Sequence, residues 1–99
     1  MLLLNVFRIS FGSPAIAYEP AVFRTLSSET RVEMLTSLKE RRKTLTQLAE
    51  ETGISLPGAK QHLGILEEAG LIRKIDEGRK WKYYELTEEG RNILATKYS

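Results

Sequence analysis

The chain has 99 residues, is 41% hydrophobic and 28% charged, and carries a formal net charge of +2, a composition typical of one folded domain. It contains no cysteine and one histidine, which excludes a disulfide, a thiolate metal site and any site that needs two imidazoles from one chain. Its apolar start lacks the basic residues of a secretion signal and no stretch is long enough to span a bilayer, so we expect a cytoplasmic protein.

The N-terminal half is predicted to begin with a strand and to continue as helices. Apolar residues alternate over residues 5–11, which indicates a half-buried strand that a glycine and a proline end. A short helix is expected over residues 21–26. Ser28 is suited to cap a longer helix. This helix is expected to end near residue 39, before a loop with a basic cluster that consists of Arg41, Arg42 and Lys43.

The next two helices have clear boundary signals. Thr44 and Gln47 have the T-x-x-Q spacing of a capping box, and Gly53 is placed to end the helix that they begin. Ser55 is predicted to cap the following helix, whose first turn tolerates Pro57 because an amide there has no helical partner to lose. We expect this helix to bury an apolar stripe that consists of Leu56, Ala59, Leu63 and Leu66.

A basic hairpin and a final helix complete the predicted fold. Residues 71–75 and 80–86 are rich in strand formers and flank a turn in which Gly78 occupies the position that needs a positive φ. Between residues 71 and 84 there are five cations and two anions, whereas the acidic residues gather elsewhere in pairs. This separation of charge suits a polyanionic partner. Thr87 is expected to cap the final helix, which runs to about residue 98.

The two helices over residues 45–52 and 56–69 indicate a function. A short helix, a turn with glycine and a longer helix form a helix-turn-helix unit, whose second helix fits the major groove of DNA. Opposite the apolar stripe, lysine and glutamine are residue types that suit guanine and adenine edges, and a helical glycine would allow close approach to DNA. The alternative is that these residues are ordinary solvated side chains. This exposed face consists of Pro57, Lys60, Gln61 and Gly64.

The hairpin adds a second candidate contact with nucleic acid. Arg79, Lys80 and Lys82 lie near the tip of a two-stranded ribbon, a shape suited to phosphates beside the groove. The alternative is a solvated, charged turn. Aromatic residues alternate with these lysines, and we expect Tyr84 to face the core and Trp81 to face outward.

Four segments resemble a known family: LSSETRVEML, LTQLAEETGIS, AKQHLGILEEAGLI and GRKWKYYELTEEG. They make residues 26–86 similar to the ArsR-type and related winged helix-turn-helix regulators of bacteria and archaea. The resemblance implies a mainly α fold with a small β-hairpin, and a dimer that acts usually as a repressor. It places the recognition helix, residues 56–69, in the major groove and the wing, residues 71–86, on the phosphate backbone.

The residues expected to contact DNA are Thr44, Ser55, Pro57, Gly58, Lys60, Gln61, His62, Gly64, Arg79, Lys80 and Lys82. His62 has two interpretations: it is a packed or hydrogen-bonded helix residue, or a phosphate contact, since the resemblance places it near the DNA backbone. Metal sensors of the family carry cysteines near the helix over residues 45–52, or carboxylates and histidines in the last helix. Here TLTQL and EEGRNILATKYS lack these ligands. We therefore expect no metal and no cofactor, and the effector is left open.

The two ends of the chain are candidates for dimerisation. We divide the chain into an N-terminal strand extension, residues 1–20, and the winged helix-turn-helix domain, residues 21–99. An isolated hydrophobic strand favours aggregation unless it is paired, so the extension is expected to pair with its copy or to lie across the partner's helices. The alternative is an edge strand within its own subunit. The residues assigned to dimerisation are Phe7, Ile9, Phe11, Ile93, Leu94 and Tyr98.

The leading hypothesis is a homodimeric transcriptional regulator that binds double-stranded DNA. The alternative is a winged helix that serves as a protein-interaction module in a larger assembly. We do not expect an enzyme, because the sequence has no nucleophile beside a base and no glycine-rich phosphate loop.

Overall fold

The computed structural model describes residues 20–78 and 80–97. The predicted N-terminal strand over residues 5–11, with Phe7, Ile9 and Phe11, lies outside the described residues, as do Arg79 and Tyr98. The elements are α1 (Pro20–Leu26), α2 (Glu29–Glu40), β1 (Lys43–Thr44), α3 (Leu45–Thr52), α4 (Leu56–Glu68), β2 (Ile72–Ile75), β3 (Tyr83–Leu86) and α5 (Glu88–Lys97). The five predicted helices within this part of the chain are thus confirmed. No helix among the described residues combines the length and the apolar character needed to cross a membrane.

The helices begin at the caps that the sequence predicts. The Ser28 side chain accepts a hydrogen bond from the backbone of Arg31, and Thr44 and Gln47 form both hydrogen bonds of the capping box. The Thr87 hydroxyl accepts from the amide of Gly90 at 3.1 Å at the start of α5. Each of these side chains satisfies an amide that has no partner within its own helix. The positions of the helices along the chain are therefore determined locally.

The sheet has three antiparallel strands in the order β1-β3-β2. In the hairpin, Ile72 lies opposite Leu86 and Ile75 opposite Tyr83. The strands are shorter than predicted, so the connection covers residues 76–82 instead of a tight four-residue turn. Gly78 has a φ of +77°, as expected. The connection is held by side chains, because the Asp76 carboxylate accepts from the Gly78 amide at 3.0 Å and lies 3.6 Å from Lys82 Nζ.

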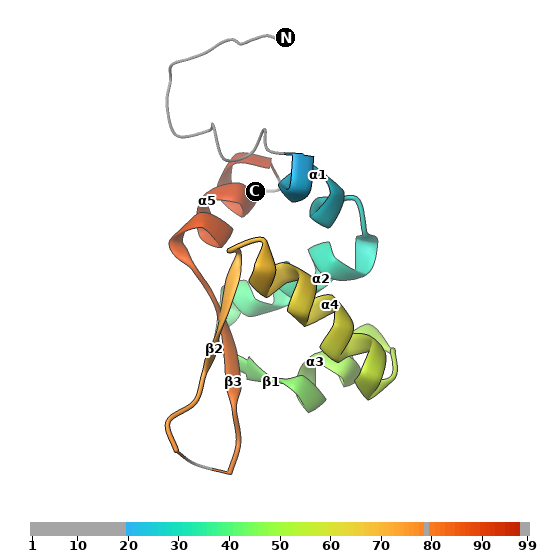
Figure 1. Ribbon diagram of the computed structural model, residues 1–99, viewed down its shortest axis with the longest axis vertical. Coiled ribbons are helices and arrows are strands. Elements are labelled where there is room, and N and C mark those ends of the chain that lie inside the picture. Colours follow the sequence, from blue (N-terminus) through green and yellow to red (C-terminus); the bar gives the residue numbers. More distant parts are fainter. Residues whose placement is uncertain (1–19, 79, 98–99) are drawn as a thin grey trace, which may run out of the picture.

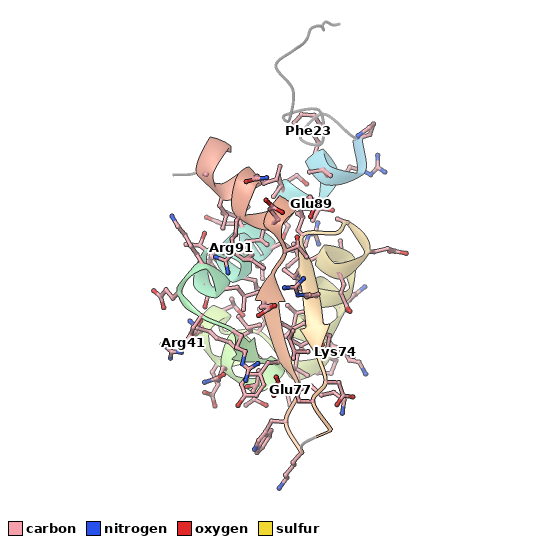
Figure 2. All side chains as sticks on the ribbon, turned by 90° about the vertical axis from the view of Figure 1, so that its left-hand side faces the viewer. Phe23, Arg41, Lys74, Glu77, Glu89 and Arg91 are labelled. Carbon is pink, nitrogen blue, oxygen red and sulfur yellow. The ribbon has the colours of Figure 1, made fainter. Side chains whose placement is uncertain are left out.

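The core is a single cluster built around α2. Met34, Leu35 and Leu38 from this helix are at most 1% exposed, and the cluster extends into α3, α4, the sheet and α5. Figure 1 shows α1 and α5 together at one end of the molecule and the tip of the β2–β3 hairpin at the other. Figure 2 shows the same separation, with Phe23 of α1 and Glu77 of the hairpin far apart.

Two predictions about burial are wrong. Ala59, Leu63 and Leu66 of α4 are fully buried as expected, but Leu56 is 49% exposed. Leu56 begins the helix, and the first residue of α4 that the core covers is Ala59. Ile93 and Leu94, assigned to dimerisation, are only 4% and 3% exposed, because this face of α5 packs on the core of its own chain. These two side chains therefore do not form an apolar surface on the single chain.

Candidate nucleic-acid interface

The turn between α3 and α4 fixes the direction of the second helix. Gly53 has a φ of +73°, and its amide donates to the carbonyl of Ala49 at 2.9 Å. The amide of Ile54 donates to the same carbonyl at 3.2 Å. Ser55 then caps α4 by accepting from the amide of Gly58 at 3.1 Å. This arrangement is a helix-turn-helix unit with a left-handed glycine at the end of its first helix.

The face of α4 opposite the core is bare. Pro57, Lys60, Gln61 and Gly64 are all exposed, as the helical spacing predicts. A Cβ atom added at Gly64 would meet nothing within 4 Å. In residues 20–78 and 80–97, no hydrogen bond or ion pair involves the side chain of Lys60 or Gln61. The two side chains therefore keep their donors and acceptors available for a ligand.

The hydroxyl groups of Thr44 and Ser55, which cap α3 and α4, differ in whether they keep a hydrogen-bond donor free for a ligand. The Thr44 hydroxyl accepts from the amide of Gln47 at 3.2 Å and donates to its side-chain oxygen at 3.3 Å, so both of its functions serve the cap. The Ser55 hydroxyl serves the cap only as an acceptor, which leaves its proton for another acceptor. Gly58 lies close to this cap, since an added Cβ would be 3.1 Å from Ser55 Oγ. Of the two hydroxyls, that of Ser55 is the one whose proton the cap leaves available to a ligand.

His62 is half-buried against α2 instead of being fully open. A terminal nitrogen of Arg31 lies 3.1 Å from His62 Nδ1. Burial first, and then the charge of Arg31, hold the pKa of His62 below its ordinary value. This contact corresponds to the interpretation of His62 as a hydrogen-bonded helix residue.

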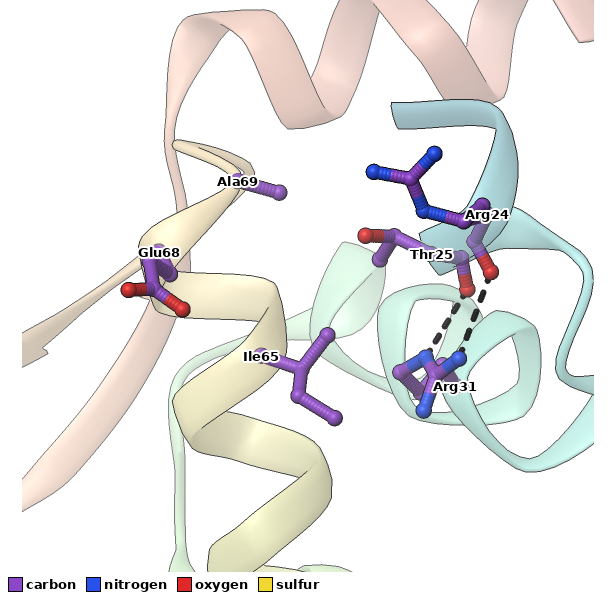
Figure 3. Close-up of a pocket in the computed structure, with 6 residues that line it drawn as sticks. All are labelled: Arg24, Thr25, Arg31, Ile65, Glu68 and Ala69. Carbon is purple, nitrogen blue, oxygen red and sulfur yellow. Dashed lines mark hydrogen bonds between the residues drawn. The ribbon is translucent and has the colours of Figure 1, made fainter. Parts of the chain in front are cut away.

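Arg31 connects three helices beside a shallow cleft. Its guanidinium also donates to the carbonyls of Thr25 at 2.9 Å and Arg24 at 3.3 Å, at the end of α1 (Figure 3). The cleft has a volume of about 380 Å³ and lies between these residues and the C-terminal part of α4. It is lined by Arg24, Thr25, Arg31, Ile65, Glu68 and Ala69. Among the described residues, no group of three or more metal-ligating side chains comes together.

The hairpin carries exposed cations and one large exposed aromatic ring. Trp81 is 55% exposed, and Lys80 Nζ lies 5.3 Å from the centroid of its ring. Lys82 forms an ion pair with Asp76. In the described part of the chain, the side chain of Lys80 contacts only the ring of Trp81. Tyr84 is 6% exposed and faces the core, which confirms the predicted orientation of β3. Lys80, like the exposed Lys74 of β2, therefore has no acidic partner among the described residues.

The three residues of the predicted basic cluster before α3 differ in burial, since Arg41 and Arg42 are exposed whereas Lys43 is buried. Lys43 is 3% exposed, and its Nζ lies 2.6 Å from Ser37 Oγ and 3.0 Å from Glu51 Oε2. Hydrogen bonds from Ser37 and then from Lys43 lower the pKa of Glu51. Arg42 lies 3.1 Å from Glu77 and over the ring of Tyr83. Lys43 is thus a structural cation, which a count of charges along the sequence does not distinguish from its neighbours.

Comparison with known proteins identifies the family. Residues 28–74 match the family model described as "Bacterial regulatory protein, arsR family". The HTH-type transcriptional regulator KmtR from Mycobacterium tuberculosis is 40% identical over 73 residues, which are 74% of this chain and 56% of that protein. The chain belongs to the ArsR family. It spans little more than half the length of this relative.

Solved structures of similar proteins support the same assignment of the fold. The homodimeric winged helix-turn-helix DNA-binding domain of a possible ArsR-family regulator from Mycobacterium bovis is 26% identical, with a TM-score of 0.70, and the match covers 77% of this chain and 70% of that one. The transcriptional repressor BigR from Xylella fastidiosa is 30% identical, with a TM-score of 0.65, over 77% of this chain and 78% of that one. In this ArsR-family chain, α3 and α4 form the helix-turn-helix and the β2–β3 hairpin forms the wing.

The sequence does not predict three features of this region of the molecule. Leu56 is exposed at the start of α4, Arg31 contacts His62, and Lys43 is paired with Glu51. Helical spacing groups Leu56 with the buried stripe of α4, so the sequence pattern does not indicate its exposure. The other two contacts join residues of different elements, Arg31 of α2 with His62 of α4 and Lys43 of β1 with Glu51 of α3, and no sequence spacing indicates them.

Proposed function

We propose that this ArsR-family chain is a homodimeric repressor that binds double-stranded DNA, with α4 in the major groove and the wing on flanking phosphates. The observation that carries the proposal is the bare face of α4, where Lys60 and Gln61 have no partner in the described part of the chain. An α-helix fits the major groove, where lysine suits the acceptors of guanine and glutamine suits the donor and acceptor of adenine. The absence of a side chain at Gly64 lets the helix axis approach the DNA closely.

The wing would supply contacts that do not depend on sequence. Lys80 is exposed and is not paired with an acid among the described residues, so its charge is available to a phosphate. We assign Arg79 and Lys82 to the same role from their place in the sequence. Contacts with phosphates orient a protein on the duplex, whereas contacts with base edges specify the site. Ser55 would add a further phosphate or base contact at the start of α4.

We assign dimerisation to the end of the molecule that carries α1 and α5. This end lies opposite the wing, and Phe23 on α1 is 43% exposed there (Figure 2). The M. bovis domain with the same fold is homodimeric, and BigR is named a repressor. Since Ile93 and Leu94 belong to the core of their own chain, the partner would contact the outer side of α5, with Phe7, Ile9 and Phe11 of the extension as further candidates.

Selection from random duplex DNA tests the proposal. We expect enrichment of a palindrome whose half-sites lie about one helical turn apart, as a dimer with two recognition helices requires. Lys60→Ala and Gln61→Ala should each relax the preference at particular base pairs, by roughly 1–3 kcal/mol. If no sequence is enriched over random DNA, the assignment of α4 is wrong and the alternative of a protein-interaction module gains support.

A further inference from the structure

The start of α4 presents an apolar side chain among polar ones. Three large apolar residues of the described chain are exposed, and Leu56 is the one that lies on the recognition helix. Lys60 follows four residues later and thus lies beside Leu56 on the same side of the helix. The exposed surface at the N-terminal end of α4 is therefore part apolar and part basic.

The position of Leu56 is fixed by its neighbours. Ser55 caps the helix through the amide of Gly58, and Pro57 restricts the backbone of the first turn. Leu56 therefore projects from a rigid helix end instead of from a loop. In helix-turn-helix proteins the N-terminal residues of the second helix contact base edges.

A leucine side chain has no donor or acceptor, so it can recognise a single feature of the major groove. That feature is the C5 methyl group of thymine, because every other distinguishing group on a base edge there is polar. We propose that Leu56 is a specificity-determining residue that contacts the methyl group of a thymine next to the bases that Lys60 contacts. This inference rests on the proposed function and deepens it, since it names a base that the bare polar face does not specify.

Deoxyuridine is the probe that isolates this contact, since it differs from thymidine only by the missing methyl group. Each thymine of the half-site selected from random DNA is replaced in turn, and binding is followed by fluorescence anisotropy. At one position we expect the wild-type chain to bind about fourfold more weakly, the equivalent of one methyl group left in water. Leu56→Ala should bind the natural site about fourfold or more weakly, and should no longer distinguish thymine from deoxyuridine at that position.

Two control variants separate this contact from general effects on the helix. Lys60→Ala should weaken binding but retain the full effect of deoxyuridine, and Leu56→Met should restore most of the affinity that Leu56→Ala loses. Thermal unfolding of Leu56→Ala should match that of the wild type, because the side chain is half exposed. The inference is overturned if no thymine shows the effect, or if the effect persists undiminished in Leu56→Ala. Failure to enrich any sequence would instead overturn the proposed function itself, and the inference with it.

Discussion

Arg31 of α2 and His62 of α4 face each other across the helix pair, with 3.1 Å between a guanidinium nitrogen and Nδ1 of the imidazole. Because the guanidinium is only a donor, Nδ1 must act as the acceptor, and the imidazole must be neutral with its proton on Nε2. The same guanidinium holds the end of α1. The Arg31 side chain thus connects α4 with α1 and α2.

This contact predicts a loss of stability in mild acid. The pKa of His62 in the folded chain lies below the ordinary value of 6.5, so the unfolded chain takes up the proton first as the pH falls. The contribution of the neutral His62 to the free energy of unfolding is complete above pH 6.5 and decreases as the pH falls below 6.5. Urea unfolding at about pH 7.5 and about pH 5.5 should show a smaller free energy at the lower pH.

His62→Gln provides the matched control, because glutamine offers a neutral oxygen to Arg31 but does not titrate. We expect this variant to lose less stability than the wild type between the two pH values. An equal loss in the wild type and in His62→Gln would show that other groups cause the effect.

Gly90 is predicted to be essential for the packing of α5. A Cβ atom there would overlap the backbone oxygen of Leu71, which also accepts the amide hydrogen of Thr87 at 3.0 Å. Backbone atoms cannot move aside as a flexible side chain can. We expect Gly90→Ala to lower the free energy of unfolding by about 1–3 kcal/mol or more, measured in urea. A variant as stable as the wild type would contradict the close approach of α5 to the backbone of Leu71.

Gly64→Ala should have opposite effects on folding and on DNA binding. Its Cβ meets nothing in the chain, and alanine favours a helix, so stability should rise by up to about 1 kcal/mol. The added methyl group would however stand between α4 and the groove. Binding to the selected duplex should therefore weaken while unfolding moves to higher denaturant. Unchanged affinity would mean that α4 does not approach DNA through Gly64.

Glu51 and Glu50 are adjacent in sequence but should differ in their contribution to stability. Glu51 holds the buried Lys43, whereas Glu50 is exposed without a partner among the described residues. Glu51→Ala leaves a buried ammonium group with weaker partners and should cost about 1–2 kcal/mol. Glu50→Ala should be nearly neutral. Equal effects in urea unfolding would argue that the contact between Lys43 and Glu51 does not stabilise the fold.

The wing should determine how strongly binding depends on salt. Arg79→Ala is expected to weaken binding to all duplexes and to reduce the slope of log K against log salt by about one unit. Trp81 is the only tryptophan in the chain, so its fluorescence reports on the wing alone. Its emission should change when the duplex is added. An unaltered salt slope in Arg79→Ala would remove that residue from the interface.

The sequence predicts what is determined locally. Ser28, Thr44 and Ser55 cap the helices as expected, because a cap depends on amides two or three residues away. The bare face of α4 is also correct, because helical spacing fixes which residues share a side. These elements were sufficient to indicate the winged helix-turn-helix fold.

What the sequence did not predict depends on distant neighbours. β1 forms only because residues 43 and 44 pair with β3, about forty positions later in the chain. A strand of two residues is too short to show an alternating pattern in the sequence. The burial of Lys43 follows from the same pairing. Leu56 is exposed because the core does not extend to the first turn of α4. Helical periodicity does not indicate where along a helix the core ends. The contacts of the site with DNA and with a second subunit stay predictions.

The pairing of β1 with β3 has a further consequence. Thr44, which caps α3, lies opposite Tyr83 at the start of β3, so the helix-turn-helix and the wing share one piece of sheet. The distance between the helix-turn-helix and the wing is therefore nearly constant. If α4 and the wing contact DNA as proposed, a duplex that must bend or change its groove width to reach both should be bound less well, even with the correct bases. Such a protein would discriminate among operators partly by the stiffness of the DNA between the contacted positions.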